Sequence, residues 1–141
     1  MKKKKKLVVL GIVENNKGQV LISQRHDPKV KEAHLKWDLI GGTNEFGESL
    51  AETAKREIFE ETGMNVKVLR MLPECASKFW EHKDFLQYTH VFCYICKLIG
   101  GKLHLEDHKI NKLKWVNVGE LDNFEFLPTT KVFIDIYIKQ I

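Results

Sequence analysis

The amino-acid sequence predicts a single α/β domain, and three observations support this. The chain has 141 residues, about the size of one domain and long enough to bury a hydrophobic core without disulfides. Hydrophobic residues make up 43% and charged residues 30%, which excludes a disordered tail, a collagen and a disulfide scaffold. Several strand-like runs accompany one well-delimited helical pattern, so both kinds of element are expected.

Charge is unevenly placed along the chain. The net charge is +4, from 23 Lys and Arg against 19 Asp and Glu, and five of the lysines form the run Lys2–Lys6. Without that run, 18 basic residues face 19 acidic ones, a net of −1. We therefore expect residues 1–6 to be a flexible basic tip of the domain that spans 1–141. We expect no nucleic-acid partner, because nucleic-acid binding needs basic residues spread over one face.

The N-terminus and the cysteines indicate a cytoplasmic protein. The apolar run Leu7–Val13 follows the lysines as in a signal peptide, but it lacks a small-residue cleavage site and also fits a first strand. No apolar run approaches the ~20 residues of a membrane span. Cysteines number three, which suits a reducing compartment. Cys93 and Cys96 lie three apart in a strand-like run and should face opposite ways, so we interpret them as packing residues, not metal ligands.

Apolar or alternating runs predict the strands of the sheet. They are Leu7–Val13, Gln19–Arg25, Trp37–Ile40, Val66–Trp80, Phe85–Leu98 and Leu113–Val118. The first two flank a turn at residues 15–18 and should form a hairpin. Gly100 and Gly101 are expected to close a turn, and residues 119–127 a loop. The segment after Pro128 fits a strand by its alternation and a helix by its apolar spacing, and both remain open.

Ser49–Thr62 is the clearest helix. Ser49 and Glu52 have capping-box spacing, in which each side chain accepts a hydrogen bond from the other residue's backbone amide. Gly63 is placed to end the helix in the left-handed conformation. Both ends of this helix are therefore predicted from local sequence.

Three carboxylates crowd the last two turns of this helix. At about 100° per residue, Glu57, Glu60 and Glu61 share an arc of about 100°. These carboxylates repel one another, and the negative end of the helix dipole also repels them. Arg56 relieves only part of this repulsion, and its expected i,i+4 partner is Glu52. Clustered hard oxygen donors favour Mg²⁺ or Mn²⁺.

A solvated acidic face is the alternative to a metal site. Two features favour the metal site. The apolar residues Leu50, Ala54 and Ile58 adjoin the carboxylates, which places them at the margin of the buried face. A glycine pair, Gly41 and Gly42, precedes the helix, where backbone can approach an anion or offer a carbonyl to a metal.

The segment from Gly42 to Met64 carries a longer pattern. It reads Gly42-x5-Glu48-x7-Arg56-Glu57-Ile58-x-Glu60-Glu61-x-Gly63-Met64. This resembles the signature of the Nudix (MutT-like) hydrolases, with every constrained position filled. Leu21–Arg25 and Trp37–Leu39 also resemble segments of that family. The resemblance implies an α/β/α sandwich around a mixed β-sheet, and cleavage of a diphosphate linkage in a nucleoside diphosphate derivative.

The resemblance also implies roles for individual residues. Glu57 and Glu61 would be metal ligands, and Glu60 a further ligand or the group that orients or deprotonates the attacking water. A backbone carbonyl of Gly41 or Gly42 would complete the metal shell. Arg56 would hold the glutamates and Glu48 would brace the loop.

Substrate contacts are less well specified by the resemblance. Arg25 is a candidate phosphate contact and Gly42 a candidate substrate contact. Two features depart from the family pattern: Ile40 replaces a common proline, and the auxiliary acid, Glu106 or Asp107, stays open. Several aromatic residues could stack on a base or line the mouth of the glycine loop: Phe79, Trp80, Phe85, Tyr88, His90, His34 and Trp37.

The leading interpretation is a Mg²⁺-dependent pyrophosphohydrolase of a nucleoside triphosphate, acting on a small-molecule nucleotide. Hydrolysis of ADP-ribose, a nucleotide sugar or a dinucleotide is the alternative. Isomerisation of isopentenyl diphosphate and nucleotide sensing without catalysis are weaker, because the signature is intact.

Overall fold

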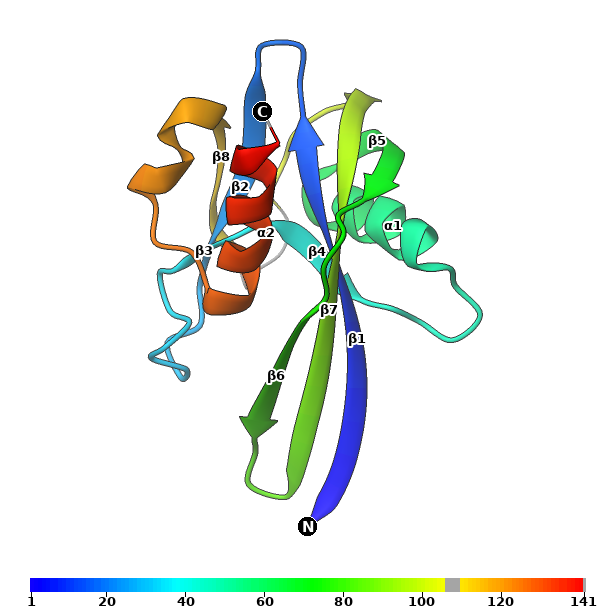
Figure 1. The fold of residues 1–141 in the computed structure, drawn as a ribbon, viewed down its shortest axis with the longest axis vertical. Helices are drawn as coiled ribbons and strands as arrows, with labels where there is room; N and C mark the ends of the chain where they lie inside the picture. Colours follow the sequence, from blue (N-terminus) through cyan, green and yellow to red (C-terminus); the bar gives the residue numbers. More distant parts are fainter. Residues whose placement is uncertain (106–109, 141) are drawn as a thin grey trace.

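A mixed β-sheet with helices on both faces organises the described chain, residues 1–105 and 110–140 of a computed structural model (Figure 1). The strands are β1 (Lys2–Glu14), β2 (Gln19–Arg25), β3 (Trp37–Asp38), β4 (Ile40–Thr43), β5 (Met64–Met71), β6 (Ala76–Glu81), β7 (Phe85–Gly101) and β8 (Ile110–Asn117). The helices are α1 (Leu50–Thr62), a 3₁₀ helix (Val118–Asn123) and α2 (Pro128–Lys139).

Strand β1 is the centre of the sheet. It pairs in parallel with β7 over its whole length and antiparallel with β2 and β4. β2 continues to β3 and β8, and β7 continues to β5 and β6, all antiparallel. The predicted mixed sheet and the β1–β2 hairpin are confirmed.

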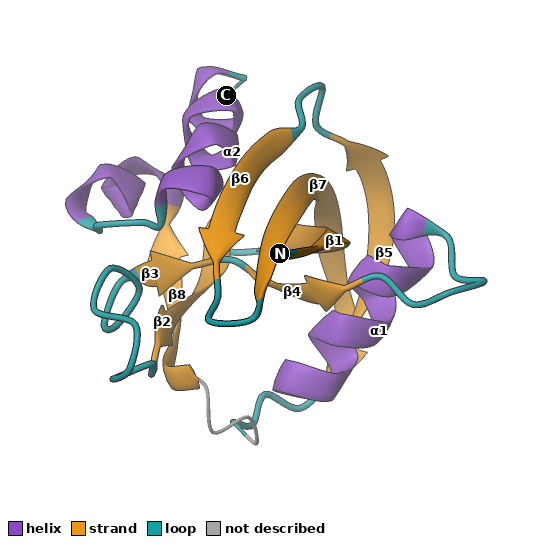
Figure 2. Ribbon diagram, turned by 90° about the horizontal axis from the view of Figure 1, so that it is seen from below, coloured by secondary structure: helices purple, strands orange, loops and turns teal. Residues whose placement is uncertain are grey.

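The two helices cover opposite faces of the sheet, as Figure 2 shows from below. On one face, Phe133, Ile134 and Tyr137 of α2 pack into a core that contains Cys93. On the other, Ile58 of α1 packs into a core that contains Cys96. The two cysteines thus face opposite ways as free, buried thiols, as predicted.

The predicted ends of α1 are confirmed. Ser49 Oγ accepts from the amide of Glu52 at 3.1 Å, and Glu52 Oε1 accepts from the amide of Ser49 at 3.0 Å. Gly63 has a φ of 74°, the left-handed region, and its amide donates to the carbonyl of Phe59. The segment after Pro128 is a helix, so the helical alternative holds there.

Several predicted boundaries are wrong. Val66–Trp80 is two strands, because the chain turns at Pro73, which has no amide hydrogen to continue a ladder. β7 runs on through the glycines at 100 and 101, and the predicted loop after residue 118 begins with a 3₁₀ helix. Among the described residues, no helix is long and apolar enough to cross a membrane.

The prediction of a flexible basic tip is also wrong. Lys2–Lys6 form the first half of β1 and pair with Phe85–Thr89 of β7. Together with β6, these segments project from the body as a three-stranded extension (Figure 1). We call this extension the arm: residues 2–6, β6 and the first half of β7, with the hairpin between them.

Candidate active site

Arg56 is the hub of the acidic cluster. Its Nε and Nη2 donate to the two carboxylate oxygens of Glu48 at 2.6 and 3.0 Å. Its Nη1 donates to Glu57 Oε1 at 2.9 Å and to Glu60 Oε2 at 3.1 Å, and its Nη2 also reaches the carbonyl of Thr43 at 3.0 Å. Arg56 therefore ties α1 to β4 and to the loop between them. The expected partner Glu52 is instead occupied by the helix cap.

Glu48 holds the loop that connects β4 with α1. Its carboxylate accepts from Thr53 Oγ1 at 2.7 Å and from the amide of Glu45 at 3.2 Å, in addition to Arg56. The Arg56 guanidinium, followed by the Thr53 hydroxyl, lowers the pKa of Glu48 to about 2. Glu48 is therefore ionised at neutral pH.

Glu57 lies directly against Gly42. A Cβ built on Gly42 would lie 2.4 Å from Cδ and Oε2 of Glu57, so a side chain there would displace the carboxylate from its present position. Gly41 is pressed on β1, where an added Cβ would lie 2.0 Å from the carbonyl oxygen of Val9. The glycine pair therefore brings β4 against both α1 and β1.

Burial raises the pKa of Glu57, although Arg56 acts in the opposite direction. One guanidinium thus does not fully offset the loss of water around this carboxylate. A cation beside Glu57 would offset it further, and the neighbouring donors are hard carboxylate oxygens. The chemistry of the residues present therefore fits Mg²⁺ or Mn²⁺.

The three predicted metal ligands are not gathered around one point. Glu60 is more exposed, at 56% of its side chain, while Glu61 is half-buried. Within residues 1–105 and 110–140, no three acidic, histidine or cysteine side chains form a ready metal-binding group. Arg56 Nη1 lies between two of the three carboxylates, 2.9 Å from Glu57 and 3.1 Å from Glu60. The two candidates for an auxiliary acid, Glu106 and Asp107, lie outside the described residues.

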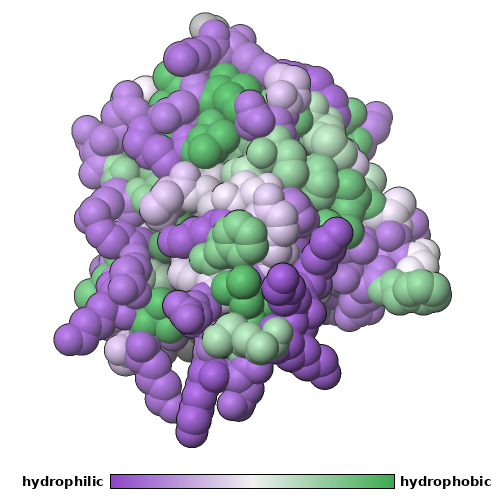
Figure 3. Space-filling view, turned by 60° about the horizontal axis from the view of Figure 1, so that its bottom comes forward, coloured by the Kyte–Doolittle hydropathy of each residue, from purple (hydrophilic) through white to green (hydrophobic). Residues whose placement is uncertain are grey.

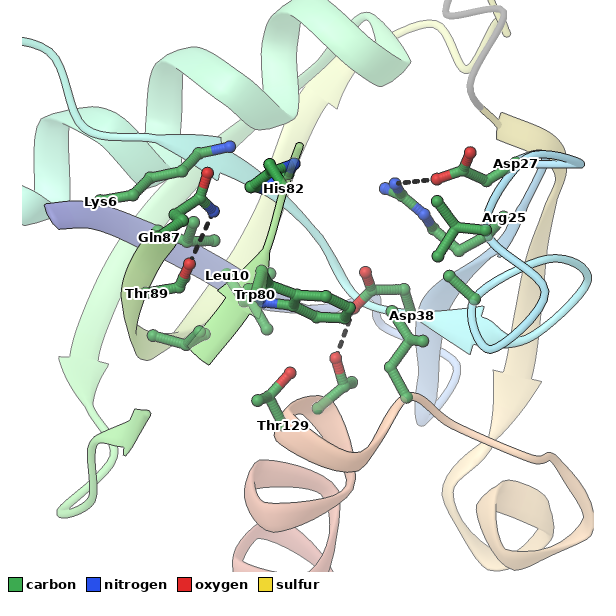
Figure 4. Close-up of a pocket in the computed structure, with 16 residues that line it drawn as sticks. Lys6, Leu10, Arg25, Asp27, Asp38, Trp80, His82, Gln87, Thr89 and Thr129 are labelled. Atoms are coloured by element: carbon green, nitrogen blue, oxygen red, sulfur yellow. Dashed lines mark hydrogen bonds and ion pairs between the residues drawn. The ribbon is translucent and has the colours of Figure 1, made fainter. Parts of the chain in front are cut away.

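A pocket of about 420 Å³ lies on the opposite face of β1, between the arm and the start of α2 (Figure 4). Val8 and Leu10 of its wall pair with Thr43 and Gly41 of β4. Thr43 is the residue whose carbonyl accepts from Arg56. Strand β1 of the pocket wall therefore pairs directly with β4, the strand that Arg56 contacts.

Arg25 lines this pocket with an unpartnered donor. Its Nε is buried and has no hydrogen-bond partner in the described structure. Its Nη2 makes a long ion pair of 3.7 Å with Asp27 Oδ2. A buried N–H without an acceptor costs free energy, and a ligand oxygen in the pocket would satisfy it.

Asp38 supplies a carboxylate to the same wall. It accepts from Thr130 Oγ1 of α2 at 2.5 Å and from the amide of Leu39 at 2.7 Å. Burial raises the pKa of Asp38, and the Thr130 hydrogen bond and the Arg25 charge offset this only in part. Asp38 and Arg25 lie on one side of the pocket and Trp80 across from them (Figure 4).

Of the predicted aromatic candidates, the structure places Trp80 in the pocket wall. Phe79 stacks on Tyr88 on the other face of the arm, with ring centroids 4.2 Å apart. Trp37 packs edge-on against Phe124, and His34 Nδ1 accepts from the amide of Asp27. None of these four candidates, Phe79, Tyr88, Trp37 and His34, lines the pocket.

Sequence reasoning missed Asp38 and Thr130. The sequence does offer a signal for Asp38, because it is an acidic residue within the short apolar strand that precedes the Gly42–Met64 motif. Thr130 carries none, because it reaches Asp38 from 92 positions away through the packing of α2.

Comparisons with known proteins agree on one family. A family model described as NUDIX domain matches residues 4–136. A protein of Bacillus subtilis (strain 168) named putative 8-oxo-dGTP diphosphatase is 33% identical over 120 residues, covering 85% of this chain and 71% of that protein. An RNA pyrophosphohydrolase of Roseobacter denitrificans is 33% identical over 95 residues. That match covers 67% of this chain and 52% of the relative.

A solved structure shows the same fold. The crystal structure of a MutT NUDIX hydrolase from Burkholderia pseudomallei superposes with a TM-score of 0.72 at 17% identity, covering 93% of this chain and 96% of that one.

Proposed function

Since the chain belongs to the NUDIX family and is a Nudix hydrolase, we propose that it is a Mg²⁺-dependent pyrophosphohydrolase of a nucleoside triphosphate. The observation that carries this is the Arg56 cluster, in which Glu57 lies against Gly42 one strand away from a polar pocket. The catalytic set contacts β4, and the nucleotide-sized pocket lies against β1, the strand that pairs with β4. The name of the Bacillus relative, a diphosphatase of a nucleoside triphosphate, supports the same choice.

Glu57 and Glu61, with a carbonyl of Gly41 or Gly42, are the groups that would hold Mg²⁺ or Mn²⁺. When bound, the ion supplies charge neutralisation at the diphosphate and lowers the pKa of a coordinated water. We assign Glu60, the exposed member that touches Arg56, to accept the proton of the attacking water. Arg56 would position Glu57 and Glu60 through its hydrogen bonds to both of them.

The pocket would take the rest of the nucleotide. The unpartnered Nε of Arg25 would donate to a phosphate oxygen, and Trp80 would stack on the base. Asp38 and Thr130 form a polar wall that can exchange hydrogen bonds with a base edge. A volume of about 420 Å³ lies at the lower end for ligand pockets and favours one nucleotide over a dinucleotide or nucleotide sugar.

A substrate panel tests this proposal. The purified protein is incubated with Mg²⁺ and common or oxidised nucleoside triphosphates, ADP-ribose, dinucleotides or nucleotide sugars, and the products are identified. Pyrophosphate and a monophosphate from one triphosphate are the expected products. Two monophosphate products from ADP-ribose or a dinucleotide would instead favour the alternative substrates. Nucleotide binding without any turnover would contradict catalysis and favour a sensor.

A further inference from the structure

The arm carries the net positive charge of the chain. It contains seven lysines, Lys2–Lys6, Lys78 and Lys83, against the acids Glu81 and Asp84, a net of +5. Because the whole chain nets +4, the remainder nets −1. The basic charge is thus concentrated on one ordered structural feature, contrary to the expectation from the sequence.

Strand pairing places lysines and aromatic rings on one face of the arm. Lys2 lies opposite Phe85, Lys4 opposite Gln87, and Gln87 is also opposite Trp80 on its other side. Directly opposed residues point to the same face, and alternate residues along a strand recur every ~6.6 Å. This face is therefore an array of cations and rings.

The rings and cations of this face already touch. Lys4 Nζ lies 4.4 Å from the centre of the Phe85 ring, and Lys78 Nζ lies 4.0 Å from that of Trp80. His82 stacks on Phe85 with centroids 4.2 Å apart. Single-stranded nucleic acids bind to such surfaces, because phosphates pair with the cations and bases stack on the rings.

The same face continues into the nucleotide pocket. Lys6, Trp80, His82 and Gln87 belong to the arm and also line the pocket. Figure 4 shows these residues facing Arg25 and Asp38 across the cavity, and Figure 3 shows hydrophilic side chains around paler and hydrophobic ones where the lower part of the molecule comes forward. A nucleotide in the pocket would thus lie at the base of the arm.

We propose that the arm binds a single-stranded oligonucleotide whose 5′-terminal nucleotide occupies the pocket. The inference rests on the proposed nucleotide site for its terminal contact. The arm supplies the remaining contacts, with Lys2 and Lys4 on phosphates and Phe85 beneath a base. This proposal replaces the expectation of no nucleic-acid partner, which depended on the lysines lying outside the fold.

An anionic membrane is the other polyanion that a basic, aromatic surface could meet. The arm fits it less well, because Trp80 and Phe85 are half-buried and lie against Lys78, Lys4 and His82. Membrane-binding surfaces instead project apolar side chains into the lipid.

The test measures binding in EDTA, so that no hydrolysis is involved. The probe is a 3′-fluorescent RNA of about ten nucleotides with a 5′-monophosphate, and its anisotropy is recorded between about 50 and 200 mM salt. The variant K2Q/K4Q removes two lysines from the pocket face. K3Q/K5Q removes two from the same strand on the opposite face and is the matched control.

Each neutralised phosphate contributes about −0.7 to the slope of log K against log salt for single strands. K2Q/K4Q should therefore make the slope shallower by about 1.4, and K3Q/K5Q by less than half of that. Phe85→Leu should weaken binding about fivefold or more through lost stacking. Triphosphate turnover with Mg²⁺ should be unchanged in K2Q/K4Q.

Three results would overturn the proposal. They are no salt-dependent RNA binding by the wild type, equal effects of the two lysine pairs, and stronger binding to vesicles of phosphatidylcholine and phosphatidylserine than to RNA. Failure of the proposed function would be seen separately, as an absence of triphosphate turnover. RNA binding in EDTA would still report on the arm.

Discussion

At the scale of single residues, the chemistry depends on where a carboxylate can come close to backbone. Gly42 gives Glu57 its place, and Arg25 faces the pocket with a donor that nothing in the described structure satisfies. Substitutions at Gly42 and at Asp38, which lies beside Arg25 in the pocket wall, test these two sites.

Gly42→Ala should reduce turnover with little loss of stability. The new Cβ would lie 2.4 Å from the Glu57 carboxylate, which sits at the end of a flexible side chain and can move away. A displacement of about 1 Å at a reacting group can cost about 10²-fold in rate. Steady-state kinetics and thermal unfolding would show both effects. Gly119→Ala is the control, since nothing lies within 4 Å of its added Cβ, and equal kinetics in the two variants would contradict the argument.

Asp38→Asn should change how stability depends on pH. The folded-state pKa of Asp38 lies above its ordinary value of 3.8, so the folded state binds the proton more tightly than the unfolded state. The stability from this group is complete below pH 3.8 and is lost as the pH rises through the raised pKa. The free energy of unfolding of wild type should therefore fall relative to D38N as the pH rises from the acid range, in urea titrations at a series of pH values. A difference that does not vary with pH would contradict this assignment.

At the scale of elements, the sequence was most informative where the determinants are local. Ser49, Glu52 and Gly63 act within one turn of their own helix, and all three behave as predicted. Contacts between distant segments were not predictable. Lys2–Lys6 join the sheet only because β7 extends beside them, and Asp38 meets Thr130 only because α2 returns to β3.

The helix cap can be tested directly. Ser49→Ala removes the acceptor of the Glu52 amide and should cost about 1 kcal/mol in the free energy of unfolding. Ser49→Asp keeps a side-chain acceptor at the same position and should be close to wild type. Denaturant titration compares the two, and equal losses would mean that the cap contributes nothing to stability.

At the scale of the whole molecule, the central sheet divides two tasks between its faces. The acidic cluster lies with α1 and β4, and the pocket lies toward α2 and the arm, on the strand β1 that pairs with β4. The signature predicted the residues of the cluster, since they lie within 23 consecutive positions. The pocket draws on β1, β2, β3, β6, β7 and α2, and its membership follows from strand register, which no local motif encodes.

The proposed hydrolysis of a nucleotide diphosphate linkage depends on Glu57 as a ligand of the metal. The most direct measurement is the Mg²⁺-dependent turnover number of Glu57→Gln on the best substrate of the panel. The control is Glu52→Gln, on the same helix, where glutamine still fits the capping box. We predict a fall of at least about a hundredfold for Glu57→Gln, with the fold intact by circular dichroism, and near-normal turnover for Glu52→Gln. A Glu57→Gln protein that keeps the wild-type rate would contradict the role proposed for Glu57.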